Sequence, residues 1–275
     1  MTRASALIDT RVIYCGDCLD QLRKLPDGCV DLIYIDPPFN SNRNYEVFWG
    51  ETKEKRAFED RHASTQAYID FMRPRCVELA RVLKKTGSFY YHCDWHASHY
   101  VKVMLDQIFG ENLFRGEIIW KRTSAHADAK RQWGAVHDSI FFYTGSDDYT
   151  FHPQYGAYDE HYLLDKYRHV DDAGRRYRLS DLRSPQPRPN LIYDYKGYKP
   201  HPNGWAVSRE RREQLEAEGR LHFPKRPQGR IELKRYLDER KGMPAGNVWD
   251  DIDPINSQAL ERSIWGSSSV LSWVQ

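Results

Sequence analysis

Residues 30–35 form a short, nearly unbroken apolar run, Val-Asp-Leu-Ile-Tyr-Ile, and the rest of the chain is most simply understood as its support. A run of this length is typical of a strand that is covered on both faces. It ends at Asp36, and the prolines Pro37 and Pro38 cannot donate to a strand ladder. Phe39 then adds an aromatic ring. The pattern predicts a carboxylate, two rigid residues and a ring at the carboxyl end of a buried strand, where ligands collect in open α/β sheets.

This arrangement suits the exocyclic amine of adenine, which is a poor nucleophile because its lone pair is delocalised into the ring. The Asp36 carboxylate can accept a hydrogen bond from one N–H group, and the main-chain carbonyl of Pro37 can accept one from the other. Fixed acceptors of this kind stabilise charge that develops on the nitrogen as it attacks a methyl group. Phe39 offers a face on which an extruded base can stack. The alternative is that Asp-Pro-Pro is only a turn that ends the strand.

Several separated blocks of the chain match one protein family in the same order. They are Gly16–Leu19, Asp36–Tyr45, Gly87–Asp94, Glu117–Trp120 and His137–Asp138. With these blocks the chain resembles the N4-cytosine/N6-adenine DNA methyltransferase family, in the subgroup whose catalytic motif precedes its cofactor motif. The resemblance extends from about residue 11 to about residue 262. It implies methyl transfer from S-adenosylmethionine to double-stranded DNA, and an Asp rather than a Ser at the head of the motif makes adenine the family's usual target.

The resemblance also implies roles for individual residues. The catalytic residues would be Asp36, Pro37, Pro38 and Phe39. The cofactor would be bound by Asp17, Asp36, His92 and Asp94, which all lie where predicted strands end. Asp17 has an equally good alternative, because an Asp just before a helix is a common N-cap.

One departure from the family concerns the cofactor. Its members bind S-adenosylmethionine through a glycine-rich turn of the Asp-Pro-Phe-x-Gly-x-Gly type, and this subgroup places that turn near the C-terminus. Residues 253–262 begin to approach this pattern, but residues 263–275 do not continue it. We therefore expect a frameshift or truncation near Leu260, an incomplete sheet and weak or absent cofactor binding, because only Gly permits such close backbone approach.

Periodicity predicts the other elements of an α/β fold. We expect strands at 11–15, 87–92, 114–120 and 138–143. We also expect helices that begin near Leu19, at a cap formed by Ser64 or Thr65, and at His99. Gly87 is expected to end the second helix, and Gly110 the third. Strands that alternate with helices favour a doubly wound arrangement. The prediction is an incomplete Rossmann-like methyltransferase sheet with an inserted, irregular target-recognition lobe.

The predicted domains are a catalytic core at 1–149, a DNA-binding lobe at 150–247, and a return segment at 248–275 with an atypical tail. Residues 121–250 contain 24 Lys and Arg against 19 Asp and Glu, whereas the whole chain has a net charge of only +2. Basic and aromatic side chains next to a catalytic edge suit phosphate contacts. The candidate DNA contacts are Tyr45, Lys121, Arg122, His126, Lys130, Arg131, Arg175 and Arg176. A solvated loop is the alternative for the segment 121–133.

Composition narrows the remaining classes. No apolar run approaches the roughly 20 residues that span a bilayer, and five irregularly spaced cysteines suggest a reducing, cytoplasmic environment. Cys15 and Cys18 form a lone C-x-x-C pattern without a second pair, so no metal site is predicted. A restriction endonuclease subunit and a homodimer stay open as partners. A catalytically inactive nucleic-acid-binding fragment, and an enzyme acting on cytosine N4 or RNA, are the alternative functions.

Overall fold

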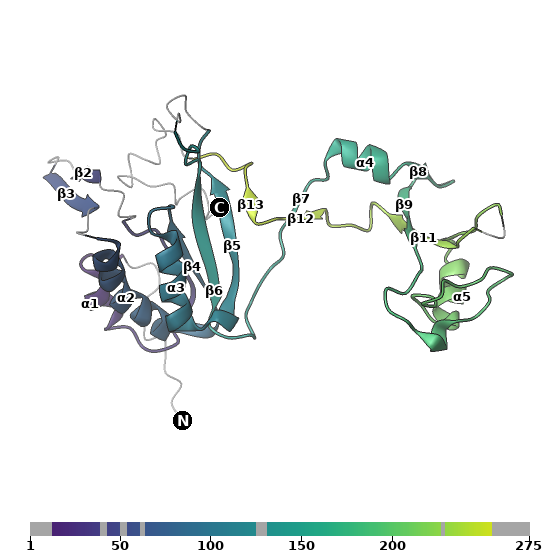
Figure 1. Ribbon diagram of the computed structural model, residues 1–275, viewed down its shortest axis with the longest axis horizontal. Helices are drawn as coiled ribbons and strands as arrows, with labels where there is room; N and C mark the ends of the chain where they lie inside the picture. Colours follow the sequence, from purple (N-terminus) through teal and green to yellow (C-terminus); the bar gives the residue numbers. More distant parts are fainter. Residues whose placement is uncertain are drawn as a thin grey trace. The chain divides into compact units, whose positions relative to one another are not determined.

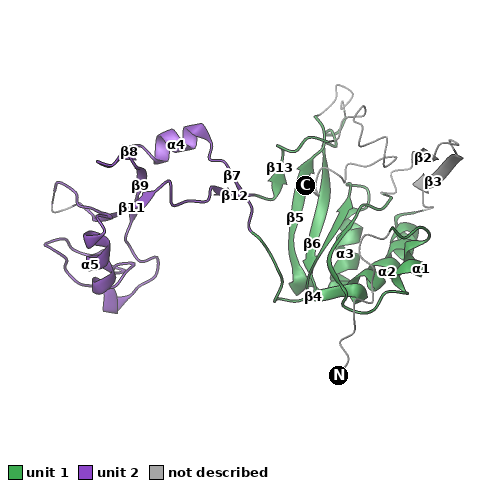
Figure 2. Cartoon of the chain, turned by 180° about the vertical axis from the view of Figure 1, so that it is seen from behind, with its two compact units in different colours: residues 1–152, 246–275 green, residues 153–245 purple. Residues whose placement is uncertain are grey.

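The computed structural model describes residues 13–38, 43–49, 54–60, 64–124, 131–226 and 229–254, with the backbone alone described in 43–49 and 54–60. The chain divides into two compact units (Figure 2). Unit 1 contains Met1–His152 and Gly246–Gln275, and unit 2 contains Pro153–Ala245. The expected roles of these parts of the chain, a catalytic core and a DNA-binding lobe, stay predictions.

Unit 1 is built on a five-stranded sheet in the order β1-β4-β6-β5-β13 (Figure 1). The strands are β1 (Val30–Ile35), β4 (Leu83–Cys93), β6 (His137–Thr144), β5 (Phe114–Lys121) and β13 (Val248–Trp249). β1 runs parallel to β4, and β13 parallel to β5, but β6 is antiparallel to both of its neighbours. The predicted α/β class is therefore confirmed, whereas the sheet is mixed rather than all-parallel.

Helices α1 (Cys18–Leu22), α2 (Thr65–Val82) and α3 (Ser98–Phe109) lie beside one another on one side of this sheet (Figure 1). The α2 helix begins as predicted, because the Ser64 Oγ accepts a hydrogen bond from the Ala67 N–H at 3.1 Å. The α3 helix ends at Gly110, whose φ of 94° few other residues adopt. A short 3₁₀ turn, η1 (Glu111–Leu113), then leads into β5.

The core of unit 1 forms between these helices and one face of the sheet. Alternate side chains of β4, from Phe89, Tyr91 and Cys93, are fully buried there together with Leu105 of α3. The buried hydroxyl groups of Tyr91 and Tyr68 satisfy each other at 2.8 Å. Because successive strand residues point to opposite faces, the residues between these positions lie on the other side of the sheet.

Three predictions about local structure were wrong. β1 is not covered on both faces, since Leu32 is 62% exposed. Ile13–Cys15 form no strand, and residues 11–12 lie outside the described residues. Gly87 does not end α2, because the helix is already capped at Leu83 and Gly87 lies inside β4. The Lys-Lys-Thr-Gly sequence resembles a helix end, but β4 pairing overrides this local preference.

A two-stranded antiparallel hairpin follows the Asp-Pro-Pro segment. It consists of β2 (Arg43–Trp49) and β3 (Glu54–Asp60), in a register that places Tyr45 opposite Phe58. The sequence did not predict this hairpin, because β3 is mostly polar and lacks the strict alternation of a half-buried strand.

Unit 2 has a smaller four-stranded antiparallel sheet in the order β10-β11-β9-β8. Its strands are β10 (Leu221–His222), β11 (Glu232–Tyr236), β9 (Arg176–Asp181) and β8 (His169–Val170). A second pair joins β7 (Tyr155–Gly156) to β12 (Met243–Pro244). The remaining elements are α4 (Glu160–Lys166), η2 (Pro189–Leu191) and α5 (Arg209–Ala217).

The core of unit 2 includes one buried cation. The guanidinium of Arg212 on α5 lies 3.4 Å from the ring centre of Trp205, and the rings of Tyr193 and Tyr195 are within 5.4 Å and 5.2 Å. None of its side-chain nitrogens has a hydrogen-bond partner in the described structure, and burial lowers the pKa of Arg212 to about 10. Cation–π attraction therefore supplies the stabilisation that a buried charge requires.

Candidate functional site

The site begins where β1 ends. Asp36 follows the last residue of the strand, and its side chain is 17% exposed. Its Oδ1 lies 3.1 Å from the Nδ1 of His92, which occupies the matching end of the parallel strand β4. Pro37 and Pro38 are partly buried, and Phe39 lies outside the described residues. The carboxylate is thus fixed by a neighbour and still reachable at the carboxyl edge of the sheet.

His92 contacts polar groups through both ring nitrogens. Nδ1 lies 3.0 Å from the Tyr34 hydroxyl as well as 3.1 Å from Asp36, and Nε2 lies 3.3 Å from Oδ2 of Asp138. The edge of the Trp120 ring also packs against the imidazole, with ring centres 5.8 Å apart. The His92 side chain is therefore held on each side by elements from different strands.

Asp138 is the most deeply buried carboxylate of this group, with a side chain that is 2% exposed. It also binds the Nε of Arg122, which lies 3.1 Å from Oδ1 and 3.0 Å from Oδ2. Arg122 follows β5 and its side chain is 44% exposed. A chain of alternating charges therefore runs from Asp36 through His92 and Asp138 to Arg122 at the surface.

Electrostatics favour the charged form of the imidazole. Burial alone would lower the pKa of His92, but its hydrogen bonds to Asp138 and Asp36 and their negative charges raise the pKa to about 9. Burial and the same two carboxylates raise the pKa of the Tyr34 hydroxyl, which stays protonated at neutral pH. His92 is therefore an imidazolium at neutral pH.

The other predicted cofactor residues also have partners within the chain. Asp17 caps α1 through a 2.8 Å hydrogen bond from the Leu19 N–H, and Arg75 binds its second oxygen at 2.6 Å and lowers its pKa. Asp94 is buried and accepts hydrogen bonds from the His96 N–H and from the His96 ring. Their cofactor role remains a prediction. Their carboxylate oxygens each accept a hydrogen bond already, so they would have to share or exchange these contacts to hold S-adenosylmethionine.

The predicted DNA contacts of unit 1 are described only in part. Lys121 is exposed at the end of β5, and Arg131 is exposed beyond it. Arg122 is exposed in part but bound to Asp138. His126 and Lys130 lie outside the described residues, and so does the side chain of Tyr45 on β2. Among the described residues of this set, Arg122 alone is linked to the site, through Asp138 rather than through a direct contact with Asp36.

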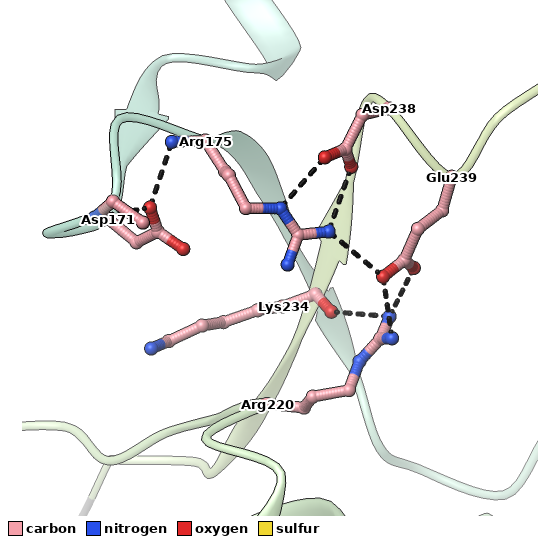
Figure 3. Close-up of polar contacts among 7 residues, drawn as sticks. Asp171, Arg175, Arg220, Lys234, Asp238 and Glu239 are labelled. Carbon is pink, nitrogen blue, oxygen red and sulfur yellow. Dashed lines mark hydrogen bonds and ion pairs between the residues drawn. The ribbon is translucent and has the colours of Figure 1, made fainter.

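In unit 2, Arg175 is engaged in an ion-pair cluster (Figure 3). Its Nε and Nη2 bind the two carboxylate oxygens of Asp238 at 2.8 and 2.9 Å, and Nη2 also lies 3.2 Å from Glu239. Arg220 binds both oxygens of Glu239, at 2.8 and 2.7 Å. Two arginines and two carboxylates balance each other here, so Arg175 contributes little free charge for a phosphate.

The next arginines form a different surface. Arg176 and Arg178 occupy alternate positions of β9, so they share a face, and Arg235 of β11 is paired directly with Arg178. Burial and the nearby charges of Arg240, Arg178 and Arg220 lower the pKa of Arg235. Within the described residues no salt bridge involves Arg176 or Arg178, and the Arg178 Nε is buried without a partner. This arginine face carries uncompensated positive charge.

Two site residues were missing from the sequence prediction, namely Tyr34 and Asp138. Tyr34 is part of the apolar run and gave no polar signal. Asp138 belongs to a block that carries the family resemblance, but its contact with His92 depends on the position of β6 beside β4. The parts of the chain that the structure describes contain no group of three or more His, Cys, Asp and Glu residues that could hold a metal ion. Among the described helices, none is both long and apolar enough to cross a membrane.

Comparison with known proteins gives a consistent picture. A family model described as DNA methylase, of the N6/N4 type, matches residues 30–262. The chain is 24% identical over 260 residues to the type II methyltransferase M.EcaI of Enterobacter cloacae. The aligned region is 94% of this chain and 56% of that protein. It is 27% identical to the Mod subunit of the type III restriction-modification enzyme StyLTI of Salmonella typhimurium, over 86% of this chain and 40% of that protein.

A third relative is the DNA adenine methyltransferase YhdJ of Escherichia coli. It is 28% identical over 144 residues, which are 52% of this chain and 44% of that protein. The chain thus spans about half the length of the curated relatives that it matches.

The charged state of His92 predicts a pH-dependent stability. Below about pH 6.5 the imidazole is protonated in both the folded and unfolded chains, and its contribution is fully present. As the pH rises through about 9 the folded chain also loses this proton, and the contribution disappears. The difference in unfolding free energy between the wild type and His92→Gln should therefore shrink by up to about 3 kcal/mol between pH 6 and 10.

Urea unfolding of both proteins across this pH range measures the difference, and groups that titrate identically in the two proteins cancel. A difference that stays constant, or grows with pH, would contradict a protonated His92.

Proposed function

We propose, given that this chain belongs to the N6/N4-type DNA methylase family, that it is the base-holding part of a methyltransferase acting on the N6 amine of adenine in double-stranded DNA. The observation that carries the proposal is the Asp36 carboxylate, held by His92 at the end of β1 and directly followed by Pro37. S-adenosylmethionine is the proposed methyl donor. Membership of the subgroup in which the catalytic motif precedes the cofactor motif is part of the same proposal.

The proposed mechanism uses two acceptors. Asp36 accepts a hydrogen bond from one N–H of the adenine amine, and the Pro37 carbonyl accepts one from the other. The proline ring fixes φ near −65°, so the acceptors are set before the base arrives. When bound, the donor would supply an electrophilic methyl group whose bond to sulfur breaks as the bond to the amine nitrogen forms. Positive charge develops on that nitrogen until it loses one of its protons. Asp36 stabilises that charge, because a pre-oriented carboxylate needs no reorganisation during the reaction.

Adenine is favoured over cytosine because the motif begins with Asp rather than Ser. In this family a motif that begins with Asp usually belongs to an enzyme that methylates adenine. The relative named DNA adenine methyltransferase agrees with this choice. The relative that is a restriction-modification Mod subunit supports an endonuclease subunit as the proposed partner. The alternative is a chain that binds nucleic acid without catalysis, and it is favoured by the occupied polar atoms of Asp17, His92 and Asp94.

Transfer of label from methyl-labelled S-adenosylmethionine to duplex DNA separates the two functions. Digestion of the product to nucleosides, with RNA tested in parallel, then identifies the base. We expect N6-methyladenine. Finding N4-methylcytosine would mean that cytosine is the target base, and labelled RNA would mean that RNA is the substrate. DNA binding without methyl transfer would favour the inactive fragment.

The first prediction from this mechanism concerns Asp36→Ala. Methyl transfer should fall by on the order of 100-fold or more, because a pre-oriented group facing the developing charge is lost. Binding to duplex DNA should change little. Asp31→Ala is the matched control, since Asp31 lies on the same strand with an exposed side chain that contacts only Lys84 among the described residues. Loss of DNA binding together with transfer would instead indicate a structural role for Asp36.

The second prediction concerns the arginine face of unit 2. Arg176→Gln should weaken binding to all duplex sequences to a similar extent and reduce the salt dependence of binding by about one counterion. Arg211→Gln removes the same charge from the exposed side of α5, where Arg211 is paired with Glu218. Fluorescence anisotropy with labelled duplexes at several salt concentrations compares the two variants. Equal effects of both substitutions would remove the arginine face from the proposed interface.

The third prediction concerns the methyl donor. S-adenosylmethionine should bind this chain only weakly, with no saturable heat at micromolar concentrations in calorimetry, because the predicted cofactor side chains already bind one another or neighbouring groups. Adenosine serves as the ligand control. Micromolar affinity for S-adenosylmethionine would contradict the prediction.

A further inference from the structure

The geometry points to His92 as a positioning residue that fixes the Asp36 carboxylate for the amine, with Asp138 and Arg122 fixing His92 in turn. This inference rests on the proposed function, since Asp36 is the group that would face the substrate. It gives His92 a role different from the cofactor contact expected from the sequence. It also gives Arg122 a role besides the expected phosphate contact.

The contacts form one continuous line that links four strands. Asp36 lies 3.1 Å from Nδ1 of His92, and Nε2 of His92 lies 3.3 Å from Asp138. Asp138 is 3.0 Å from the Nε of Arg122. The line begins at the end of β1, crosses β4 and β6, and reaches the surface just beyond β5. No single element holds more than one of its four charged members.

The charges of this line balance. Two carboxylates alternate with an imidazolium and a guanidinium, so the group is neutral as a whole. Its two central members, His92 and Asp138, are each only 2% exposed, and a buried charge without a partner is strongly destabilising. Removing any member would leave its neighbour uncompensated. The group therefore behaves as a unit rather than as separate pairs.

Protonation of the imidazole is what allows it to hold both carboxylates. A neutral imidazole carries one N–H and can donate to only one side, whereas an imidazolium donates from both ring nitrogens. The groups that face His92 are Tyr34, Asp36, Asp138 and the ring of Trp120, with Arg122 behind Asp138. The two carboxylates outweigh the effect of burial and raise the pKa of His92 to about 9.

This arrangement leaves one carboxylate oxygen for the substrate. His92 binds Oδ1 of Asp36, and among the described residues Oδ2 has no hydrogen-bond partner. Rotation of the carboxylate would break its contact with the imidazolium, so Oδ2 keeps a fixed direction. A fixed acceptor is what the amine requires, because small displacements of a catalytic group reduce the rate steeply.

Arg122 closes the line at the surface. Its main-chain N–H binds the Val136 carbonyl at 2.9 Å, so its position depends on the segment that leads into β6. Its Nε binds the outer side of the Asp138 carboxylate, opposite the contact of that carboxylate with His92. Arg122 and Asp138, which lie near the two ends of the predicted DNA-binding loop at 121–133, are thereby linked through His92 to Asp36.

The first arm of the test is nuclear magnetic resonance of the full chain with ¹⁵N-labelled histidine, with His92→Gln to assign the signal. In the wild type both ring nitrogens of His92 should be protonated at pH 7.5, with a titration midpoint near 9. Asp138→Asn and Asp36→Asn should each lower the midpoint by at least one pH unit, because burial remains while a carboxylate is lost. Arg122→Gln should not lower it, because that substitution removes a positive charge.

The second arm is single-turnover methyl transfer. His92→Gln and Asp138→Asn should lower the transfer rate at least tenfold while the Kd for duplex DNA changes less than threefold. Ser139→Ala is the control, since Ser139 lies on the same strand as Asp138 and binds Glu117 instead. The conservative variant Arg122→Lys should retain more transfer activity than Arg122→Gln.

The two arms distinguish failure of the inference from failure of the proposed function. A wild-type chain that transfers no methyl group to DNA refutes the function, and the resonance arm alone then decides whether the imidazolium holds Asp36. A midpoint near the ordinary 6.5, or one unaffected by Asp138→Asn and Asp36→Asn, overturns the inference. So does an active His92→Gln variant with an unchanged transfer rate.

Discussion

The contact between the Asp36 carboxylate and the His92 imidazolium is the interaction on which the candidate site depends. It joins the ends of two parallel strands, and it exists only because β4 lies directly beside β1. Asp138 of the neighbouring strand β6 contacts the other ring nitrogen of His92. The helices α1 to α3 pack on one face of the sheet, and these charged groups lie on the opposite face, next to the buried ring of Trp120.

The sequence predicted the elements with regular local patterns and missed those that depend on distant partners. Hydrophobic periodicity, together with helix-ending residues such as Gly110, predicts the elements β1, α3, β5 and β6. The insertion of β6 between β4 and β5 could not be predicted, because strand order is set by long-range pairing that leaves no local pattern. The exposed Leu32 shows the same limit, since an apolar run does not reveal whether another layer covers it.

The candidate site shows a similar division. Asp36 could be located because a carboxylate after a strand and before two prolines is a local pattern. The contact of His92 with Asp138 could not be predicted, because the sequence around a charged residue at a strand end does not show whether its partner is water or a buried imidazole. Arg175 and Arg176 are adjacent in sequence, yet one is neutralised by Asp238 and the other is not. Only the folded positions of the carboxylates distinguish them.

The register between β1 and β4 has a consequence for how such a chain can vary. Residues that alternate along β4 point in turn to the core under the helices and to the opposite face, which carries His92. Insertion or deletion of one residue upstream in this strand would move Cys93 or Tyr91 into the place of His92 and turn the imidazole toward the helices. Length changes in related chains should therefore be confined to the connections between strands, while substitutions that preserve side-chain parity remain tolerable within β4.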